Sequence, residues 1–382
     1  MKILFDATPM VASKTGIAYY TERLVTEMAK AHPEAEFVGF YFNFLGKRNT
    51  SHLPKLPNLR YQNTSVIPSK VVFQLRRFGI EFPIECMALT RADFILYANF
   101  LGYPSIFKTP SAMVIHDLTY LDLPDYVSGK LRSDLTRFVP KQIKRSALLL
   151  TVSEFSKRRI QQTYHPSQDI LVTPVPPDAP VMHSGTEREK VLKKAGIVKP
   201  YILFVGTIEP RKNITQLVKT YATLPKKLRD QYSLVIAGRI GWQCADVVVA
   251  LDDAQKNGLD VIHLGYVSDS LREVLYQSAS LFTTASHYEG FGMPILEAMS
   301  YGVPCAISDI PVFHEVADTS ALYFDQDNVN SISRALTSLL SDEAKRKKYA
   351  KLSKARVKTF DWRKIANATY AKIAETVQKQ QK

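Results

Sequence analysis

Short runs of apolar residues alternate with segments of helical periodicity along the first half of the chain. Such runs, rich in β-branched and aromatic residues, are typical of strands, and their alternation with helices is typical of a parallel sheet. We expect strands at residues 3–5, 37–42, 94–97, 113–115, 148–152 and 170–173. The first half therefore predicts an α/β domain with a mostly parallel sheet.

The second half repeats this alternation more clearly. A capping box from Ser270 to Glu273 predicts one helix start, and a second helix is expected between Pro294 and Gly302. The expected strands are residues 201–205, 234–237, 261–264, 281–284, 303–307 and 322–324. Two doubly wound α/β domains result, and in such sheets ligands bind beyond the carboxyl ends of the strands.

The boundary between the two domains is expected near a proline-rich stretch at residues 173–180, which a charged segment at 187–194 follows. Residues 362–378 read as an amphipathic helix that packs across the boundary. We expect an N-terminal domain at 1–180, a linker at 181–198, a C-terminal domain at 199–358 and a terminal helix within 359–382 that packs toward the N-terminal domain.

Composition supports two folded domains and a basic surface. The chain has 382 residues, of which 46% are hydrophobic, and its formal charge is +14 because 50 Lys and Arg outnumber 36 Asp and Glu. This charge favours an acidic partner, which could be nucleic acid, anionic lipid or a phosphorylated substrate. The alternative is a basic surface that serves solubility alone.

The cysteines and the first residues indicate where the protein works. Cys86, Cys244 and Cys305 are odd in number and widely spaced, which argues against a disulfide framework or a zinc site and favours a reducing, cytoplasmic setting. Asp6 interrupts the apolar run that a signal peptide would continue, and no later run approaches the roughly 18 residues of a membrane span. Any membrane contact is therefore expected to be peripheral.

A glycine-broken loop runs into a helix at residues 287–297, which read HYEGFGMPILE. The glycines allow the backbone to approach a ligand, and a helix N-terminus attracts phosphate. Glu289 is expected in the loop and Glu297 in the first helical turn, so both can border the same cleft and could bind sugar hydroxyls. The alternative is that Glu297 complements the helix dipole and the glycines only make a turn.

A second loop of interest, TIEPRKN at residues 207–213, follows the strand that ends at Gly206. It places Arg211 and Lys212 just before a helix, where two cations would neutralise a departing nucleoside diphosphate. The alternative is an ordinary solvated basic pair.

Two further pairs follow strands of the first domain. Thr15 and Gly16 open a helix, and His116 with Asp117 ends a strand, so both loops are expected to face the cleft between the domains. His116 could bind a sugar hydroxyl or transfer a proton, with Asp117 fixing its tautomer. The alternative is a structural His-Asp pair. The sequence lacks a dinucleotide-binding Gly-x-Gly-x-x-Gly after the first strand, a P-loop and a nucleophile-elbow serine.

Together these motifs resemble retaining glycosyltransferase family 4, the mannosyltransferase-like group 1 glycosyltransferases, over essentially the whole chain. EGFGMPILEAM looks like the family's Glu-x7-Glu motif, VGTIEPRKN like its diphosphate loop, HD at His116 like its acceptor-side histidine, and TVSEFSK at Thr151 like its interdomain strand. The resemblance implies a GT-B fold, in which two Rossmann-like domains face a central cleft and the C-terminal helix crosses back to the first domain. The C-terminal domain would hold the nucleotide sugar and the N-terminal domain the acceptor.

The resemblance also implies roles for single residues. Glu297 would bind the ribose hydroxyls and Glu289 the transferred sugar, and His116 would contact that sugar near the reacting carbon. The remaining donor contacts would come from Gly16, Arg211 and Lys212 at the diphosphate, from Gly290, Phe291 and Gly292 through the backbone, and from Tyr266 beside the nucleobase. Many members carry Gly-Arg where this chain has Gly206-Thr207, so Arg211 or Arg239 would supply the missing phosphate contact.

Members of this family generally need no bound metal or other cofactor, and the sequence offers no Asp-x-Asp in a suitable loop. The implied reaction retains the anomeric configuration by front-face displacement, in which the leaving phosphate helps deprotonate the acceptor. A double displacement through Glu289 is the alternative. The donor suggested by the likeness of EPRKN and HYEGFGMP to mannosyltransferase members is GDP-mannose, and a UDP-sugar is the alternative.

Basic and apolar residues gather at 70–78 and again at 130–145, where they could lie on an anionic membrane. A lipid-linked sugar or another glycan would then be the acceptor in cell-surface polysaccharide synthesis. The alternative is a pair of solvated helix faces with a soluble acceptor. Rival functions are a nucleotide-sugar epimerase, a glycoside phosphorylase and a nucleic-acid-binding protein, but no RNA-binding motif is present and we expect no nucleic-acid partner.

Overall fold

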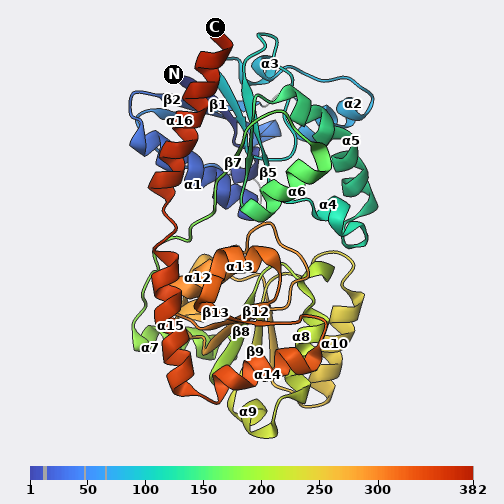
Figure 1. Cartoon of the computed structure of the whole chain (residues 1–382), viewed down its shortest axis with the longest axis vertical. Coiled ribbons are helices and arrows are strands. Elements are labelled where there is room, and N and C mark those ends of the chain that lie inside the picture. The colour runs from blue at the N-terminus through green and yellow to red at the C-terminus, as the bar shows by residue number, and fades with distance from the viewer. Residues whose placement is uncertain (12–14, 47–48, 65–66, 382) are drawn as a thin grey trace. The chain divides into compact units, whose positions relative to one another are not determined.

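Two separate parallel β-sheets organise the chain in the computed structural model, which describes residues 1–11, 15–46, 49–64 and 67–381 (Figure 1). Each sheet belongs to its own compact unit. The first unit comprises Met1–Leu118, Lys130–Val175 and Asp361–Lys382, and the second comprises Thr119–Gly129 and Pro176–Phe360. The α/β class predicted from the alternating pattern is confirmed.

The first unit contains, among its described residues, a sheet of seven strands in the order β3-β2-β1-β4-β5-β6-β7. The interior strand β1 is parallel to both of its neighbours, β2 and β4, with Ile3 beside Phe37 and Phe94. The strands are β1 Lys2–Asp6, β2 Glu36–Phe42, β3 Leu59–Thr64, β4 Phe94–Tyr97, β5 Ser111–Ile115, β6 Leu148–Thr151 and β7 Ile170–Val172. The helices are η1 Thr8–Val11, α1 Gly16–Ala31, η2 Phe44–Gly46, α2 Ser69–Arg77, α3 Ile84–Ala88, α5 Gly129–Arg145, α6 Glu154–Tyr164 and α16 Trp362–Gln381.

One strand of this sheet was not predicted from the sequence. Strand β3 reads LRYQNT and forms the sheet edge beside β2, where several of its side chains are exposed or half-buried. An edge strand needs no continuous apolar run, so the pattern that marks the central strands is missing from it.

The C-terminal helix α16 packs along α1 in the first unit, as its amphipathic pattern indicated (Figure 1). The rings of Tyr370 and His32 stack with centroids 3.7 Å apart. Lys372 on α16 forms a 2.6 Å ion pair with Asp169, which precedes β7. The last segment of the chain is therefore an integral layer of the first unit.

The second unit contains, over the part of the chain that is described, a sheet of six parallel strands in the order β10-β9-β8-β11-β12-β13. The strands are β8 Tyr201–Val205, β9 Ser233–Ala237, β10 Val261–Gly265, β11 Leu281–Thr284, β12 Cys305–Ser308 and β13 Ala321–Phe324. The helices are α4 Thr119–Asp122, η3 Pro124–Tyr126, α7 Gly185–Lys194, η4 Pro210–Lys212, α8 Ile214–Thr223, α9 Lys226–Gln231, α10 Ala245–Lys256, α11 Asp269–Ser278, α12 Met293–Ser300, α13 Pro311–Ala317, η5 Asp318–Ser320, α14 Val329–Leu340 and α15 Glu343–Val357.

One local prediction in this unit needs correction. The predicted capping box is wrong, because Ser268 rather than Ser270 caps α11 by accepting a hydrogen bond from the amide of Leu271. Glu273 instead accepts from His183, which lies far away in the sequence. The stretch expected to be a linker contains the helix α7, which Ser184 caps.

In each sheet, the direction in which successive strands are added reverses between two neighbouring strands. In the second unit, β8 lies between β9 and β11, so the chain leaves β8 toward one side and the later strands continue on the other. The loops after β8 and β11 meet at this reversal, which is where doubly wound sheets bind ligands. The corresponding pair of strands in the first unit is β1 and β4.

Two further observations concern membrane-spanning helices and the cysteines. No helix among the described residues is long and apolar enough to cross a membrane. Cys86 is an exposed free thiol, and Cys244 and Cys305 are buried free thiols.

Candidate functional site

The loops after β8 and β11 are joined by ion pairs that centre on Glu289. Arg211 donates to one carboxylate oxygen of Glu289 at 2.5 Å, and Lys212 donates to the other. The hydroxyl of Ser286 also donates to Glu289, at 3.0 Å. Only 8% of Glu289 and 8% of Lys212 is exposed, so the pairing takes place in a largely water-excluded setting.

The charges of this cluster determine one another. Burial raises the pKa of Glu289, but Arg211 and Lys212 outweigh it and lower the pKa to about 2. Burial lowers the pKa of Lys212, an effect that Glu289 opposes and Arg211 reinforces. Glu289 is therefore an ionised carboxylate at neutral pH, because two cations and a hydroxyl satisfy its oxygens.

Backbone contacts bind the two loops to each other. Arg211 donates from its guanidinium to the carbonyl of Tyr288 at 2.9 Å, and its own carbonyl accepts from the amide of His287 at 2.8 Å. A second carboxylate, that of Glu209, accepts from Arg211 at 2.9 Å. The guanidinium is thus fixed from both loops before any ligand arrives.

Two unusual backbone conformations shape these loops. Asn213, with φ of 56°, adopts the left-handed conformation between η4 and α8, and its side-chain amide donates to the carbonyl of Gln326 at 2.8 Å. Gly292, with φ of 117°, precedes α12, and a Cβ there would lie 3.1 Å from the ring of Phe313. A glycine is therefore required where the loop turns into the helix.

The second glutamate of the predicted motif lies on α12 itself. Glu297 is half-buried and accepts a 2.7 Å hydrogen bond from the hydroxyl of Tyr276 on α11. Gly290 and Phe291 lie in the loop just before α12, and the buried Phe291 ring packs edge to face against Phe360. The predicted donor-binding residues at 289–297 therefore form one continuous loop and helix start.

Arg239 and Tyr266 follow the neighbouring strands β9 and β10. The guanidinium of Arg239 lies 5.4 Å from the centre of the Tyr266 ring, and 62% of Tyr266 is exposed. An exposed aromatic ring at this edge is suited to stacking on a planar ligand. The glycine after β8, Gly206, approaches the loop after β9 so closely that a Cβ on Gly238 would clash with the carbonyl oxygen of Gly206.

The segment Thr119–Gly129 was not singled out from the sequence, yet it belongs to the second unit. The ring of Tyr126 lies 5.8 Å from that of His287, and the indole of Trp242 donates to the Tyr126 carbonyl at 2.9 Å. His287 also lies 3.6 Å from a carboxylate oxygen of Asp327. Two separate parts of the chain, around Tyr126 and Asp327, therefore lie beside the histidine that opens the predicted motif.

The remaining predicted residues, Gly16 and His116, lie in the first unit. Gly16 is the exposed first residue of α1, which Thr15 caps. The Nε2 atom of His116 lies 3.0 Å from the carbonyl oxygen of Ala98. Burial lowers the pKa of His116, and the Ala98 carbonyl and Asp117 oppose this only in part. The ring is therefore neutral, and its tautomer is fixed by a backbone carbonyl, with Asp117 acting electrostatically.

The two basic stretches form α2 and most of α5, and part of their charge is used inside the first unit. Arg76 is buried and pairs with Glu81 at 2.9 Å, while Arg77 pairs with Asp134. By contrast, Phe78 is 83% exposed and Ile80 is 52% exposed. Arg145 also pairs with Glu81, at 2.5 Å. Other exposed cations remain along this region, namely Lys70, Lys130, Arg132, Arg137, Lys141 and Lys144.

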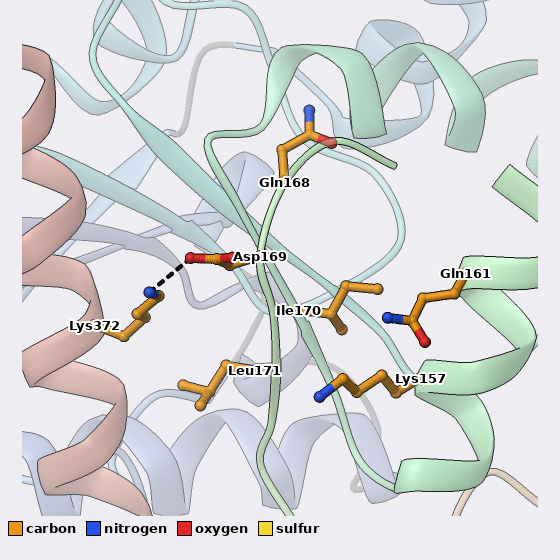
Figure 2. Close-up of a pocket in the computed structure, with 7 residues that line it drawn as sticks. All are labelled: Lys157, Gln161, Gln168, Asp169, Ile170, Leu171 and Lys372. Carbon is orange, nitrogen blue, oxygen red and sulfur yellow. Dashed lines mark ion pairs between the residues drawn. The ribbon is translucent and has the colours of Figure 1, made fainter. Parts of the chain in front are cut away.

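A cavity of about 430 Å³ opens beside the edge strand β7, and Lys157, the last residue of the motif TVSEFSK, is among the residues that line it (Figure 2). Figure 2 shows Lys157 and Gln161 reaching toward it from α6, with the ion pair of Lys372 and Asp169 on its other side. None of the residues that line it is a predicted site residue.

Comparison with known proteins connects this geometry to a family. The family model described as glycosyl transferases group 1 matches residues 187–356, which include both loops of the Glu289 cluster. O-antigen chain mannosyltransferase B of Escherichia coli is 30% identical over 383 residues, covering 97% of this chain and 98% of the relative. O-antigen chain mannosyltransferase RfbU of Salmonella typhimurium is 31% identical over 229 residues, or 59% of this chain and 60% of the relative.

Solved structures agree on the fold. Sucrose-phosphate synthase from Thermosynechococcus elongatus superposes with a TM-score of 0.75 at 16% identity, covering 98% of each chain. WaaG, a glycosyltransferase involved in lipopolysaccharide biosynthesis, gives a TM-score of 0.69 at 14% identity, with 98% of this chain and 99% of that one covered. These likenesses show the GT-B fold. With a relative that matches at 30% identity along nearly its entire length, the chain belongs to the group 1 glycosyltransferases.

Proposed function

We propose that the protein transfers mannose from GDP-mannose, with retention of anomeric configuration, to a glycan or lipid-linked acceptor in cell-surface polysaccharide synthesis. The observation that carries this proposal is the buried cluster of Glu289, Arg211 and Lys212 at the reversal point of the second sheet. The mannosyltransferase relatives in O-antigen synthesis support the choice of sugar and pathway class.

The cluster suits a diphosphate leaving group. Arg211 and Lys212 are preorganised by Glu289, so they need little rearrangement when negative charge develops on the departing phosphate. Arg239 and the backbone of residues 290–292 would complete the phosphate contacts, and Gly16 would approach from the first unit. Glu297 would hold the ribose hydroxyls and Tyr266 would lie against the base.

The state of Glu289 favours front-face displacement over a covalent sugar–enzyme intermediate. A carboxylate with a pKa of about 2, whose oxygens accept from Arg211, Lys212 and Ser286, is a weak nucleophile. In the proposed step, the bond from the anomeric carbon to the phosphate oxygen breaks and the acceptor oxygen bonds to the same face. The acceptor proton passes to the leaving phosphate, and Glu289 binds a sugar hydroxyl.

His116 would orient the transferred sugar. Its neutral ring, with Nε2 bonded to the Ala98 carbonyl, has an acceptor lone pair at Nδ1 for a sugar hydroxyl. This role needs no proton transfer by the ring.

The first prediction concerns the nucleotide. GDP is expected to raise the melting temperature more than UDP or ADP, because a ligand at a hundredfold excess over its Kd stabilises the fold by about 2.7 kcal/mol. Transfer from GDP-mannose should then require an acceptor, yield the α-linked product by NMR and continue in EDTA. Failure of all three nucleotides to stabilise the protein contradicts the donor site. Conversion of the sugar without an acceptor would favour an epimerase. If UDP raises the melting temperature more than GDP does, the donor is a UDP-sugar and not GDP-mannose.

The second prediction concerns the charge cluster. Glu289→Gln and Lys212→Met should each lower kcat by about 100-fold or more, since losing one preorganised electrostatic contact costs roughly 3–4 kcal/mol. Lys226→Met is the matched control, because Lys226 forms an exposed pair with Asp230 in the same unit. Circular dichroism should show all three variants folded. Near-normal turnover in both cluster variants would remove the cluster from the active site.

We also propose that the exposed cations of α2 and α5, with Phe78 and Ile80, contact the anionic membrane that carries a lipid-linked acceptor. Apolar side chains beside cations suit the interface of such a membrane, and the attraction weakens with salt.

The third prediction tests this contact. The protein should sediment with vesicles containing phosphatidylglycerol at low salt, and Phe78→Ala combined with Ile80→Ala should reduce the bound fraction several-fold. Val198→Ala is the control, because Val198 is 79% exposed but lies in the second unit. Equal binding to vesicles of phosphatidylcholine alone, or full binding by the double variant, would contradict the contact.

A further inference from the structure

The carboxylate of Glu297 is held by a tyrosine on the neighbouring helix. Tyr276, near the C-terminal end of α11, donates its hydroxyl to Oε2 of Glu297 at 2.7 Å. Burial raises the pKa of Tyr276 well above its ordinary value, and the neighbouring carboxylate raises it further. The phenol is therefore neutral and acts as the donor of this bond.

The ring of Tyr276 has little freedom to move. It is only 1% exposed and stacks on Tyr301, with ring centroids 5.9 Å apart and 16° between the planes. Phe282 of β11 packs on it at 6.2 Å. A side chain fixed on both sides transmits its position to the group it bonds, so the hydroxyl sets where Oε2 of Glu297 lies.

We infer that Tyr276 is a positioning residue that orients Glu297 for a ribose diol and thereby gives the site its preference for ribonucleotides. The inference rests on the proposed function, in which Glu297 binds the ribose. It adds Tyr276, a residue of a different helix, without which the carboxylate of Glu297 would not be held in a fixed orientation.

The geometry leaves the carboxylate able to serve the ligand. A carboxylate has about four acceptor positions, and the tyrosine occupies one of them on Oε2, so both oxygens can still accept from a hydroxyl. The two vicinal hydroxyls of a ribose can each donate to one of the two carboxylate oxygens of Glu297. A Glu side chain without a partner would lose rotamer freedom on binding, and the bond to Tyr276 removes that cost beforehand.

The test compares GDP with 2′,3′-dideoxy-GDP by calorimetry, using the ratio of their Kd values as the measure of ribose preference. Wild type is expected to favour GDP by about tenfold or more, as befits hydrogen bonds to a charged group. Tyr276→Phe should reduce this ratio by at least about threefold and change the Kd of the dideoxy nucleotide little. With GDP-mannose, the variant should show a raised KM and a nearly unchanged kcat.

Tyr201→Phe is the matched control. Tyr201 is also buried at 1% exposure and donates a 2.7 Å hydrogen bond to α11, to the carbonyl of Leu275, but it does not bond Glu297. Its removal should cost stability and leave the ribose preference at the wild-type value. If Tyr201→Phe lowers the ribose preference as much as Tyr276→Phe does, the loss reflects a general disturbance of α11. That result would overturn the inference.

Glu297→Gln separates the inference from the function on which it rests. A wild-type ratio in Glu297→Gln contradicts ribose binding by Glu297. A reduced ratio in Glu297→Gln with a wild-type ratio in Tyr276→Phe overturns the role of Tyr276 alone.

If Tyr276→Phe does not fold, Glu297→Asp replaces it, because the shorter side chain loses the hydrogen bond from Tyr276 and keeps the negative charge. A wild-type ratio in Glu297→Asp then overturns the inference. If UDP or ADP is the nucleotide that binds, its own dideoxy analogue is used, and binding by none contradicts both proposals.

Discussion

The second unit is organised around one buried carboxylate whose charge must be compensated. Desolvating an ionised group costs several kcal/mol, and Glu289 meets this cost through Arg211, Lys212 and Ser286. Because the two cations come from the loop after β8 while Glu289 follows β11, neither loop can shift alone without leaving a buried charge unpaired. The same contacts that stabilise the two loops hold two cations at the point where a doubly wound sheet binds its ligand.

Around this cluster, local backbone requirements fix the direction of each element. The left-handed Asn213 and Gly292 turn their loops into α8 and α12, and α12 then places Glu297 beside Tyr276 of α11. Glu289, which pairs with the two cations, and Glu297, which bonds Tyr276, therefore belong to one continuous loop and helix start of the second unit.

Much of the architecture follows from the sequence pattern, and the failures have identifiable physical causes. Apolar runs marked the central strands, but the edge strand β3 carries polar residues such as Gln62 and Asn63 and gave no such signal. The capping box at Ser270 failed because Glu273 bonds His183, and no local pattern contains a partner that distant. The helix α7 was hidden in a stretch whose charge resembled a linker.

The sequence indicated many residues of the candidate site but not the contacts between them. Glycine spacing and paired glutamates drew attention to residues 287–297, yet the ion pairs to Arg211 and Lys212 join loops far apart in the sequence. No motif in the sequence singles out Tyr276, because the role of its hydroxyl depends on Glu297, which lies beside it only in the folded chain. Segment 119–129, with Tyr126 near His287, carried no motif at all.

The most direct measurement of the central claim is a crystal structure of the protein with the nucleoside diphosphate that binds it. Our account predicts that phosphate oxygens contact the side chains of Arg211 and Lys212 while Glu289 remains beside them. It also predicts that the ribose hydroxyls lie on Glu297. A nucleotide bound elsewhere, or one whose phosphates lie away from both cations, would contradict the account.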